Sequence, residues 1–286
     1  MYSSHMSENS KKSERVSQLI NMKLILLDFE GVLFRGNQAV PNAGRFLTAI
    51  SSNSGTKIKI VTNSTRFSSK EISDLIFTNF DVRIDEADIV NGKRMMENRI
   101  KKDGIKKVYL IGDEKLVKEL RSDRINVLTL EDHKDDKIEE IPLDEDVDAV
   151  IVAQDFNFWY KKAALATRYV IEKKCKFYVV GNDTRFAWEN NEVIPGPYTL
   201  SACIKTATFK EPIIIGKPSV DDNELSTKEY NEGIVIGDNQ KRDVAFSKKL
   251  GAKSVIILTG ITKEVAKESK PDEIFNDLGE AIEFLI

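Results

Sequence analysis

Histidine and cysteine are scarce in this chain, which has two of each among its 286 residues. His5 lies in a polar N-terminal segment and His133 lies in a run of charged residues, so we expect both to be solvated. This scarcity argues against a Ser-His-Asp triad, a Cys-His pair and a histidine-rich zinc site. Cys175 and Cys203 stand far apart and form no CxxC motif, which favours a reduced protein with ordinary thiols. The chemistry must therefore rest on carboxylates, lysine and hydroxyl groups.

The chain also lacks a basic excess and a long hydrophobic run. Its 43 Lys and Arg against 46 Asp and Glu give a net charge of −3, which predicts neither a nucleic-acid partner nor an anionic membrane surface. No apolar run approaches the roughly 18 residues that a membrane span needs. Residues 1–21 are polar and lack the apolar stretch of a secretory signal. We therefore expect a flexible N-terminal extension and a cytoplasmic protein.

What the chain does contain is a series of short apolar runs that alternate with helical patterns. This alternation predicts an α/β protein with a Rossmann-like parallel sheet and right-handed crossovers. The runs that we expect to be strands of this sheet are residues 23–27, 58–61, 213–215, 234–236 and 255–258. Each run leads into polar or glycine residues at its carboxyl side. Helical patterns at residues 68–80 and 243–250 lie between some of these runs.

Residues 85–205 interrupt the series with a second set of elements. Their expected strands are residues 108–111, 149–153 and 177–180, and their expected helices are residues 87–102, 114–123 and 160–174. A segment of about 120 residues is long enough to be a domain of its own. We therefore expect a core formed by residues 22–84 and 206–286, with an inserted α/β cap over residues 85–205 that selects the substrate.

Two carboxylates, Asp28 and Glu30, directly follow the first predicted strand. Ligands of open parallel sheets bind beyond the carboxyl ends of the strands. If the predicted strands share one edge, the residues that converge there are Asp28, Glu30, Thr62, Asn63, Lys217 and Asp238. A carboxylate in this place can attack phosphorus and form an aspartyl-phosphate, while a lysine neutralises a phosphate oxygen. Such a transfer usually needs a hard cation such as Mg²⁺, for which Asp28 and Asp238 would supply carboxylates.

Each of these residues also has an ordinary structural interpretation. Asp28 would cap the turn after its strand, Thr62 and Asn63 would begin the following helix, and Lys217 would be a surface lysine. Asp243 is either the N-cap of a helix or a partner of the metal or of Lys217. The ordinary interpretation requires all of these separate roles to occur together at the same strand ends. The joint placement of the residues therefore favours the catalytic interpretation.

Four motifs in this order resemble those of haloacid-dehalogenase-superfamily phosphatases, specifically the p-nitrophenylphosphatase or NagD-like branch with a large α/β cap. The motifs are DxDGVL at residues 28–33 with Glu30 in place of the second Asp, Thr62-Asn63-Ser64, Gly216-Lys217-Pro218, and GDxxxxD at residues 237–243. The resemblance covers residues 23 to about 265. It implies a Mg²⁺-dependent hydrolase of small phosphate monoesters, with p-nitrophenyl phosphate among its substrates.

The resemblance also implies roles for individual residues. Asp28 would be the nucleophile and a Mg²⁺ ligand, and Glu30 the general acid/base whose backbone carbonyl also binds Mg²⁺. The other residues implied are Asp238 as a metal ligand, Thr62, Asn63, Ser64 and Lys217 on the phosphate, Asn239 and Asp243 behind the metal ligands, and Asp183 and Phe186 facing the substrate from the cap. The partners to expect are a small phosphorylated metabolite and a second copy of the chain, since family members often dimerise through the cap.

Glu30 is the one departure from the family's pattern. The extra methylene moves the acid by about 1 Å, and a misplacement of that size can cost about 10²-fold in rate. We therefore expect a working but slow phosphatase. The alternative is a catalytically weakened protein of the same fold that binds phosphate or a metabolite and has a regulatory role. A phosphorylated signalling receiver is a third reading, against which the large insertion and the motif at residues 237–243 argue. The physiological substrate stays open among phosphoglycolate, nucleotides and sugar phosphates.

Overall fold

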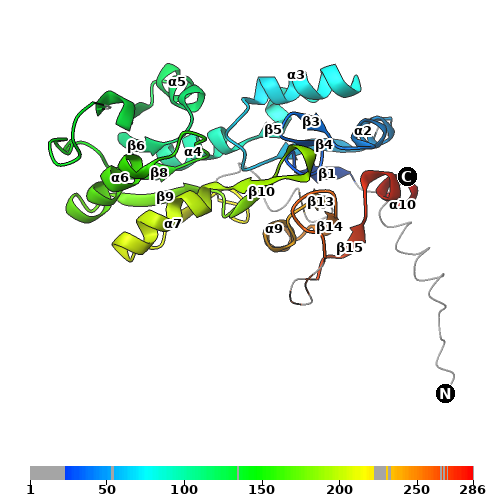
Figure 1. The fold of residues 1–286 in the computed structure, drawn as a ribbon. Coiled ribbons are helices and arrows are strands. Elements are labelled where there is room, and N and C mark those ends of the chain that lie inside the picture. The colour runs from blue at the N-terminus through cyan, green and yellow to red at the C-terminus, as the bar shows by residue number, and fades with distance from the viewer. Residues whose placement is uncertain are drawn as a thin grey trace.

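The computed structural model describes residues 23–52, 55–133, 135–221, 230, 233–264, 266, 268 and 270–285. Its elements gather around two parallel sheets that lie beside each other (Figure 1). The α/β fold with a parallel core sheet is therefore confirmed. The extension expected over residues 1–21 lies outside the described residues. None of the described helices is both long enough and apolar enough to cross a membrane.

The first sheet holds six parallel strands in the order β15-β14-β13-β1-β4-β5. These strands are β1 (Leu24–Leu27), β4 (Lys57–Val61), β5 (Ile89–Val90), β13 (Ile234–Gly237), β14 (Lys253–Ile257) and β15 (Glu273–Phe275). All four residues of β1 are buried, which suits an apolar central strand covered on both faces. Leu27 is in register with Ile236 of β13 and Ile60 of β4. The residues that follow these three strands therefore meet at one edge of the sheet.

The two faces of the first sheet pack into different hydrophobic clusters, because successive side chains of a strand point to opposite sides. The helices that cover them are α2 (Ala43–Ser51), α3 (Ser69–Phe80), α4 (Gly92–Lys102), α9 (Gln240–Leu250) and α10 (Leu278–Leu285). Ile25 and Leu27 pack with side chains of α2, α3 and α10. Leu24 and Leu26 pack with side chains of α4 and α9. Both faces of the sheet are thus buried, and the strand ends are the part left for polar groups.

The second sheet holds five parallel strands in the order β12-β9-β8-β6-β7. Its strands and helices are β6 (Lys107–Ile111), α5 (Glu114–Ser122), β7 (Asn126–Leu128), β8 (Ala149–Val152), α6 (Tyr160–Glu172), β9 (Lys176–Val180), α7 (Pro197–Thr208) and β12 (Ile213–Ile215). One face packs on α6 and α7 through residues such as Val150, Leu165 and Ile204. The other face contributes Val108 and Tyr178 to the cluster that also contains Leu26 of the first sheet. The two sheets therefore share buried apolar contacts.

Residues 213–215 form a strand, as predicted, but β12 belongs to the second sheet and not to the first. It pairs with residues 178–180 of β9, so the expectation that it shares an edge with β1 is wrong. The preceding helix α7 packs against β8 and β9 and returns the chain beside β9. The loop after β12 then crosses to the first sheet. Gly216 permits this crossing with a φ of 83°, and a Cβ there would lie 2.5 Å from Asn63 Oδ1.

The helix expected over residues 87–102 is broken at its start. Ile89 and Val90 form β5, which pairs with Ile60 and Val61 of β4, and α4 begins only at Gly92. Two consecutive buried β-branched residues favour a strand at this place, and the Asn91 side chain caps the helix that follows.

The division of the chain into core and cap at residues 84/85 and 205/206 stays a prediction. Two elements bear on where such boundaries would fall. Strand β5 lies beyond the first boundary in the sequence and belongs to the first sheet, and helix α7 spans the second boundary.

Two short hairpins meet beside the edge of the first sheet. They consist of β2 (Phe34–Arg35) with β3 (Gln38–Ala39), and of β10 (Arg185–Ala187) with β11 (Val193–Pro195). The backbone N–H of Asn37 donates to Glu189 Oε1 at 2.8 Å, and Arg35 Nη1 donates to Asn191 Oδ1 at 2.7 Å. Figure 1 shows β10 reaching from the second sheet toward the first. Polar contacts thus connect the segment after β9 to the segment after β1.

Candidate active site

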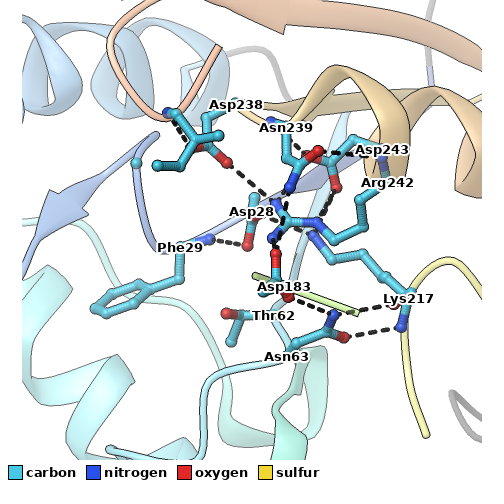
Figure 2. A network of polar contacts seen from close by, with 12 residues as sticks. Asp28, Phe29, Thr62, Asn63, Asp183, Lys217, Asp238, Asn239, Arg242 and Asp243 are labelled. Carbon is cyan, nitrogen blue, oxygen red and sulfur yellow. Dashed lines mark hydrogen bonds and ion pairs between the residues drawn. The ribbon is translucent and has the colours of Figure 1, made fainter. Parts of the chain in front are cut away.

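Asp28 stands directly after β1, and only 2% of its surface is exposed. Its Oδ1 accepts a hydrogen bond from the backbone N–H of Phe29 at 2.8 Å. Its Oδ2 lies 3.0 Å from Lys217 Nζ. Figure 2 shows this carboxylate among polar groups that come from several strand ends and one helix. The structure therefore brings a buried carboxylate to the place where parallel sheets bind ligands.

Lys217 reaches Asp28 from the loop after β12, with 1% of its surface exposed. Its Nζ is 3.0 Å from Asp28 Oδ2 and 3.0 Å from Asp243 Oδ1. The Asn63 amide fixes the backbone of Lys217 from both sides. Asn63 Oδ1 accepts from the Lys217 N–H at 2.8 Å, and Asn63 Nδ2 donates to the Lys217 carbonyl at 3.0 Å. Asn63 therefore connects the lysine loop to the edge of the first sheet.

Asp238 follows β13 and is buried next to Asp28. Its Oδ2 accepts from the backbone N–H of Ile261 at 2.8 Å. Burial raises the pKa of Asp238 to about 7, and repulsion by Asp28 and Asp243 adds to this rise. Two neighbouring glycines leave the space for this carboxylate, because a Cβ at Gly31 or at Gly260 would overlap it.

Asp243 lies in the first turn of α9 and is not the N-cap of that helix. The helix begins at Gln240, and the Asn239 side chain caps it by accepting from the Arg242 N–H at 3.2 Å. Asp243 instead accepts from the Asn239 N–H at 3.0 Å and pairs with Lys217. Burial opposes the charge of Asp243, but Arg242 and Lys217 outweigh it and hold its pKa below the ordinary value. Of its two predicted roles, the structure thus supports that of a Lys217 partner.

Arg242 is the residue of the cluster that the sequence analysis missed. Its Nη2 contacts Asp28 Oδ2, lies 3.1 Å from Asp238 Oδ1 and lies 2.8 Å from Asp243 Oδ2. Its Nη1 donates to Asp183 Oδ1 at 2.5 Å. Burial disfavours the guanidinium charge, but these four carboxylates hold the pKa of Arg242 well above its usual range. No local pattern signals this role, because Asp238 precedes the N-cap of α9 and the four-residue spacing is not a spacing within one helix.

Asp183, predicted to face the substrate, follows β9 of the second sheet and joins the cluster. Its Oδ2 accepts from Asn63 Nδ2 at 3.1 Å, and its Oδ1 accepts from Asn239 Nδ2 at 3.3 Å and from Arg242. Phe186, predicted beside it, lies half-buried in β10 opposite Ile194. Among the described residues, no hydrogen bond, ion pair or ring contact joins Phe186 to the cluster.

Glu30 turns its side chain toward a second set of residues. Its Oε1 lies 3.1 Å from Arg66 Nη1 and 3.4 Å from Ser64 Oγ. Its Oε2 is buried and has no hydrogen-bond partner within the described part of the chain. Burial raises the pKa of Glu30 to about 7, against the lowering effect of Arg66. A carboxyl group with this pKa exchanges a proton near neutral pH, as a general acid/base must.

Arg66 is a second residue that the sequence analysis missed. Its guanidinium carbon lies 4.4 Å from the ring centre of Trp188 and 4.8 Å from that of Phe67. The Phe156 ring stacks at a tilt against Trp188 with centroids 5.5 Å apart. Aromatic rings therefore pack against the guanidinium that forms the ion pair with Glu30.

The predicted phosphate-binding residues Thr62 and Ser64 lie after β4 and are buried. The Thr62 Oγ1 accepts from the Ser64 N–H at 3.2 Å. Figure 2 places Thr62 beside Asp28, Asn63 and Asp183. The predicted residues that follow β1, β4, β12 and β13 therefore lie at this edge, whereas Phe186 of β10 has no described contact with the cluster.

The donor set of this edge suits a hard cation. Single carboxylate oxygens of Asp28, Asp238 and Asp243 lie within 4.8 Å of one another, and oxygen is the ligand atom that Mg²⁺ prefers. The Glu30 side chain is not in this set, and the metal contact expected of its backbone carbonyl stays a prediction. Of the three acids, Asp243 is the one already paired with Lys217.

Two family models match this chain. One is described as haloacid dehalogenase-like hydrolase and matches residues 25–126, and the other as HAD-hydrolase-like and matches residues 209–281. Together they cover more than half of the chain, including Asp28, Lys217 and Asp238.

Several proteins that are similar to this chain over most of its length are named as phosphatases. Glycerol-3-phosphate phosphatase of Mus musculus is 26% identical over 283 residues, covering 92% of this chain and 88% of the relative. The 4-nitrophenylphosphatase of Schizosaccharomyces pombe is 25% identical over 262 residues, with coverage of 84% and 85%. A solved hypothetical protein from Pyrococcus horikoshii superposes with a TM-score of 0.75 at 27% identity, covering 93% of this chain and 100% of that one.

We expect Gly260→Ala to displace the Asp238 carboxylate, because the added Cβ would lie 2.0 Å from its Oδ2. The displaced carboxylate would lose the N–H of Ile261 and its pair with Arg242. Breaking a buried ion pair from one side costs about 3–5 kcal/mol, so the free energy of unfolding should fall by about 3 kcal/mol or more. Urea unfolding followed by circular dichroism measures this change.

Gly112→Ala is the matched control for this substitution. Its Cβ would meet the end of the Leu116 side chain at 3.2 Å, and that flexible end can shift. It should cost much less than Gly260→Ala. Equal losses in the two variants would contradict the close packing of Gly260 on the carboxylate.

Glu30→Gln should gain stability relative to the wild type as the pH rises in EDTA. Folding raises the pKa of Glu30 from 4.5 to about 7. The contribution of Glu30 to the free energy of unfolding is therefore fully present below pH 4.5, and it is lost as the pH rises through 7. Glutamine has no such loss. The gap in the free energy of unfolding should therefore change by on the order of 3 kcal/mol across this window.

Urea unfolding at several pH values measures this gap, with the exposed Glu86→Gln as control. A gap that stays the same between pH 4.5 and 7 would show that the Glu30 carboxyl keeps its ordinary pKa.

Proposed function

We propose that this chain, which belongs to the haloacid dehalogenase-like hydrolases and is a phosphoric monoester hydrolase, acts on small phosphate monoesters through an aspartyl-phosphate on Asp28 with the help of Mg²⁺. The observation that carries the proposal is the buried Asp28 carboxylate at a strand end, 3.0 Å from Lys217 Nζ and beside Asp238. One substrate phosphate could therefore reach the nucleophile Asp28, the cation of Lys217 and the carboxylates that would hold a metal.

In the first step an Asp28 oxygen attacks phosphorus, and the bond from phosphorus to the leaving oxygen breaks. The Glu30 carboxyl, with its pKa near 7, donates a proton to that leaving oxygen and becomes a carboxylate. In the second step Glu30 takes a proton from water, whose oxygen attacks phosphorus. The Asp28 carboxylate and inorganic phosphate are released, and both groups return to their starting states.

The remaining residues would position the phosphoryl group through these steps. Lys217 would neutralise one of its oxygens, and Thr62 and Asn63 would offer hydrogen bonds to others. Asn63 also holds the Lys217 loop, so its loss would act on the lysine as well as on the phosphate.

For Mg²⁺, the residues that would hold the ion are Asp28 and Asp238, with the Glu30 backbone carbonyl. When bound, the ion supplies charge neutralisation between the nucleophile and a phosphate oxygen. The carboxylate oxygens at this edge are close enough for such binding.

The leaving group would lie on the side of Glu30, because that residue must reach the leaving oxygen. Arg66, Phe156 and Trp188 surround this side and offer a cation and two aromatic faces. They suit a small phosphate monoester whose organic part is flat or carries a negative charge. 4-Nitrophenyl phosphate, from one relative's name, has a flat organic part and is therefore the first substrate to try. Glycerol 3-phosphate, from the other relative's name, has a neutral and non-planar organic part and is the comparison substrate.

A second candidate is a protein of this fold that binds phosphate or a metabolite with little turnover. The observation that favours it is that Glu30 and Asp28 are both engaged by arginines, Arg66 and Arg242. Phosphate binding with little release from any monoester would support this second candidate.

Asp28→Asn should abolish release of p-nitrophenol from p-nitrophenyl phosphate in the presence of Mg²⁺. The amide is a poor nucleophile and also a weaker metal ligand, so we expect a loss of at least about 10³-fold in kcat. The matched control is Asp74→Asn on the exposed face of α3, which should keep the wild-type rate. A similar rate in Asp28→Asn and the wild type would refute the proposed nucleophile.

Glu30→Asp should raise kcat by about 10-fold to 10²-fold, because the shorter acid restores the placement found in the family's motif. Burst and steady-state measurements with p-nitrophenyl phosphate separate the two chemical steps. Turnover that is unchanged or lower in Glu30→Asp would mean that the site has adjusted fully to glutamate.

A further inference from the structure

The Arg242 guanidinium lies among three carboxylates, two of which, those of Asp28 and Asp238, are the proposed ligands of a divalent cation. One nitrogen, Nη2, contacts Asp28 Oδ2 and lies 3.1 Å from Asp238 Oδ1 and 2.8 Å from Asp243 Oδ2. The carboxylates of these three residues are also those whose oxygens lie within 4.8 Å of one another. A point within hydrogen-bond distance of all three acids is where their negative charge is concentrated. Figure 2 shows the guanidinium at the centre of this group.

The position of Arg242 is fixed by the surrounding structure. Only 5% of its surface is exposed, and its Nε donates to Asp243 Oδ1 at 3.0 Å. Its Nη1 donates to Asp183 Oδ1, which comes from the segment after β9 of the second sheet. The Asn239 side chain accepts from its backbone N–H. The side chain is therefore held on several sides, which distinguishes it from a surface arginine that reaches an acid by chance.

Charge explains why the contact is stable. Four buried carboxylates, those of Asp28, Asp183, Asp238 and Asp243, lie around two buried cations, Arg242 and Lys217. Buried carboxylates without a partner are costly, so the cluster needs positive charge when no divalent cation is bound. A guanidinium supplies it with several donors in one plane.

We infer that Arg242 is an internal cation that occupies the divalent-cation position between Asp28 and Asp238 and must withdraw before Mg²⁺ binds there. The inference rests on the proposed Mg²⁺ site. The ion pairs with Asp183 and Asp243 give the guanidinium partners that are not proposed metal ligands, so it can remain paired after leaving Asp28 and Asp238.

The consequence is a weaker apparent affinity for the metal. When the binding-competent arrangement is only part of the population, the apparent Kd rises by the inverse of that fraction. The nearby positive charge of the arginine also opposes the incoming cation. The chain would thus be stable without metal and would engage it only at a higher concentration than an otherwise identical site without the arginine.

Isothermal titration of Mg²⁺ alone into the full chain tests this inference without using activity as the readout. Arg242→Ala should bind Mg²⁺ on the order of tenfold tighter or more than the wild type. The same variant should unfold at a lower temperature than the wild type in EDTA and regain much of this loss in Mg²⁺. Lys241→Ala is the matched control, since Lys241 is the exposed neighbour in α9 and should leave both quantities unchanged.

Arg242→Gln is the second variant, for the case in which Arg242→Ala does not fold. Glutamine keeps hydrogen-bonding capacity and removes the charge. It should also bind Mg²⁺ more tightly than the wild type. In ¹⁵N spectra of the wild type, the Arg242 Nε–H signal, identified by its loss in Arg242→Gln, should shift when Mg²⁺ is added.

The outcomes separate the inference from the function on which it rests. One outcome is that the wild type, Arg242→Ala and Arg242→Gln bind Mg²⁺ with equal affinity, and that adding Asp238→Asn to each of them abolishes binding. This outcome would support the metal site and overturn the role of Arg242. Weaker Mg²⁺ binding in both Arg242 variants would also overturn it. If no variant binds Mg²⁺ while phosphate release continues, the metal part of the proposed function fails together with the inference.

Discussion

The balance between buried carboxylates and buried cations at one sheet edge is the constraint on which the rest of this structure depends. Asp28 and Asp238 follow neighbouring strands, and the parallel register of β1 and β13 leaves them side by side. Burial raises the pKa of Asp238, and repulsion by Asp28 and Asp243 adds to this rise. Lys217 and Arg242 offset that repulsion. The fold thus places like charges together and adds opposite charges to keep them there.

These cations and their supports come from distant parts of the chain. Lys217 arrives on a loop that leaves the second sheet, and Asp183 follows another strand of that sheet. Asn63, from the first sheet, bonds to both of them. The edge is therefore complete only when the two sheets are packed together, and the shared hydrophobic cluster maintains that packing.

The sequence predicts much of this arrangement because strand ends in a parallel sheet carry strong local signals. The apolar run before Asp28 and the glycine after it predict a buried strand that ends in a turn, and the structure agrees. Strand partners depend on long-range packing, however, which is why residues 213–215 were assigned to the wrong sheet. The same limit applies to residues 87–102, where two β-branched residues pair with β4 and interrupt a helical pattern.

Side-chain partners are harder to predict than strand ends. Arg242 occupies a position that the GDxxxxD motif leaves unspecified, and its role follows only once α9 is known to begin at Gln240. The engagement of Glu30 by Arg66 depends on a loop conformation and on the Trp188 ring from the second sheet's hairpin. No local pattern records either contact.

The central claim is that Asp28 carries the phosphoryl group during turnover. The most direct measurement is mass spectrometry of protein quenched in acid within the first turnover of p-nitrophenyl phosphate, with the modified peptide sequenced. The account predicts a phosphoryl group on Asp28, which accumulates if Glu30 activates water poorly. Turnover with a phosphoryl group on another residue, or with none on the protein at any quench time, would contradict it.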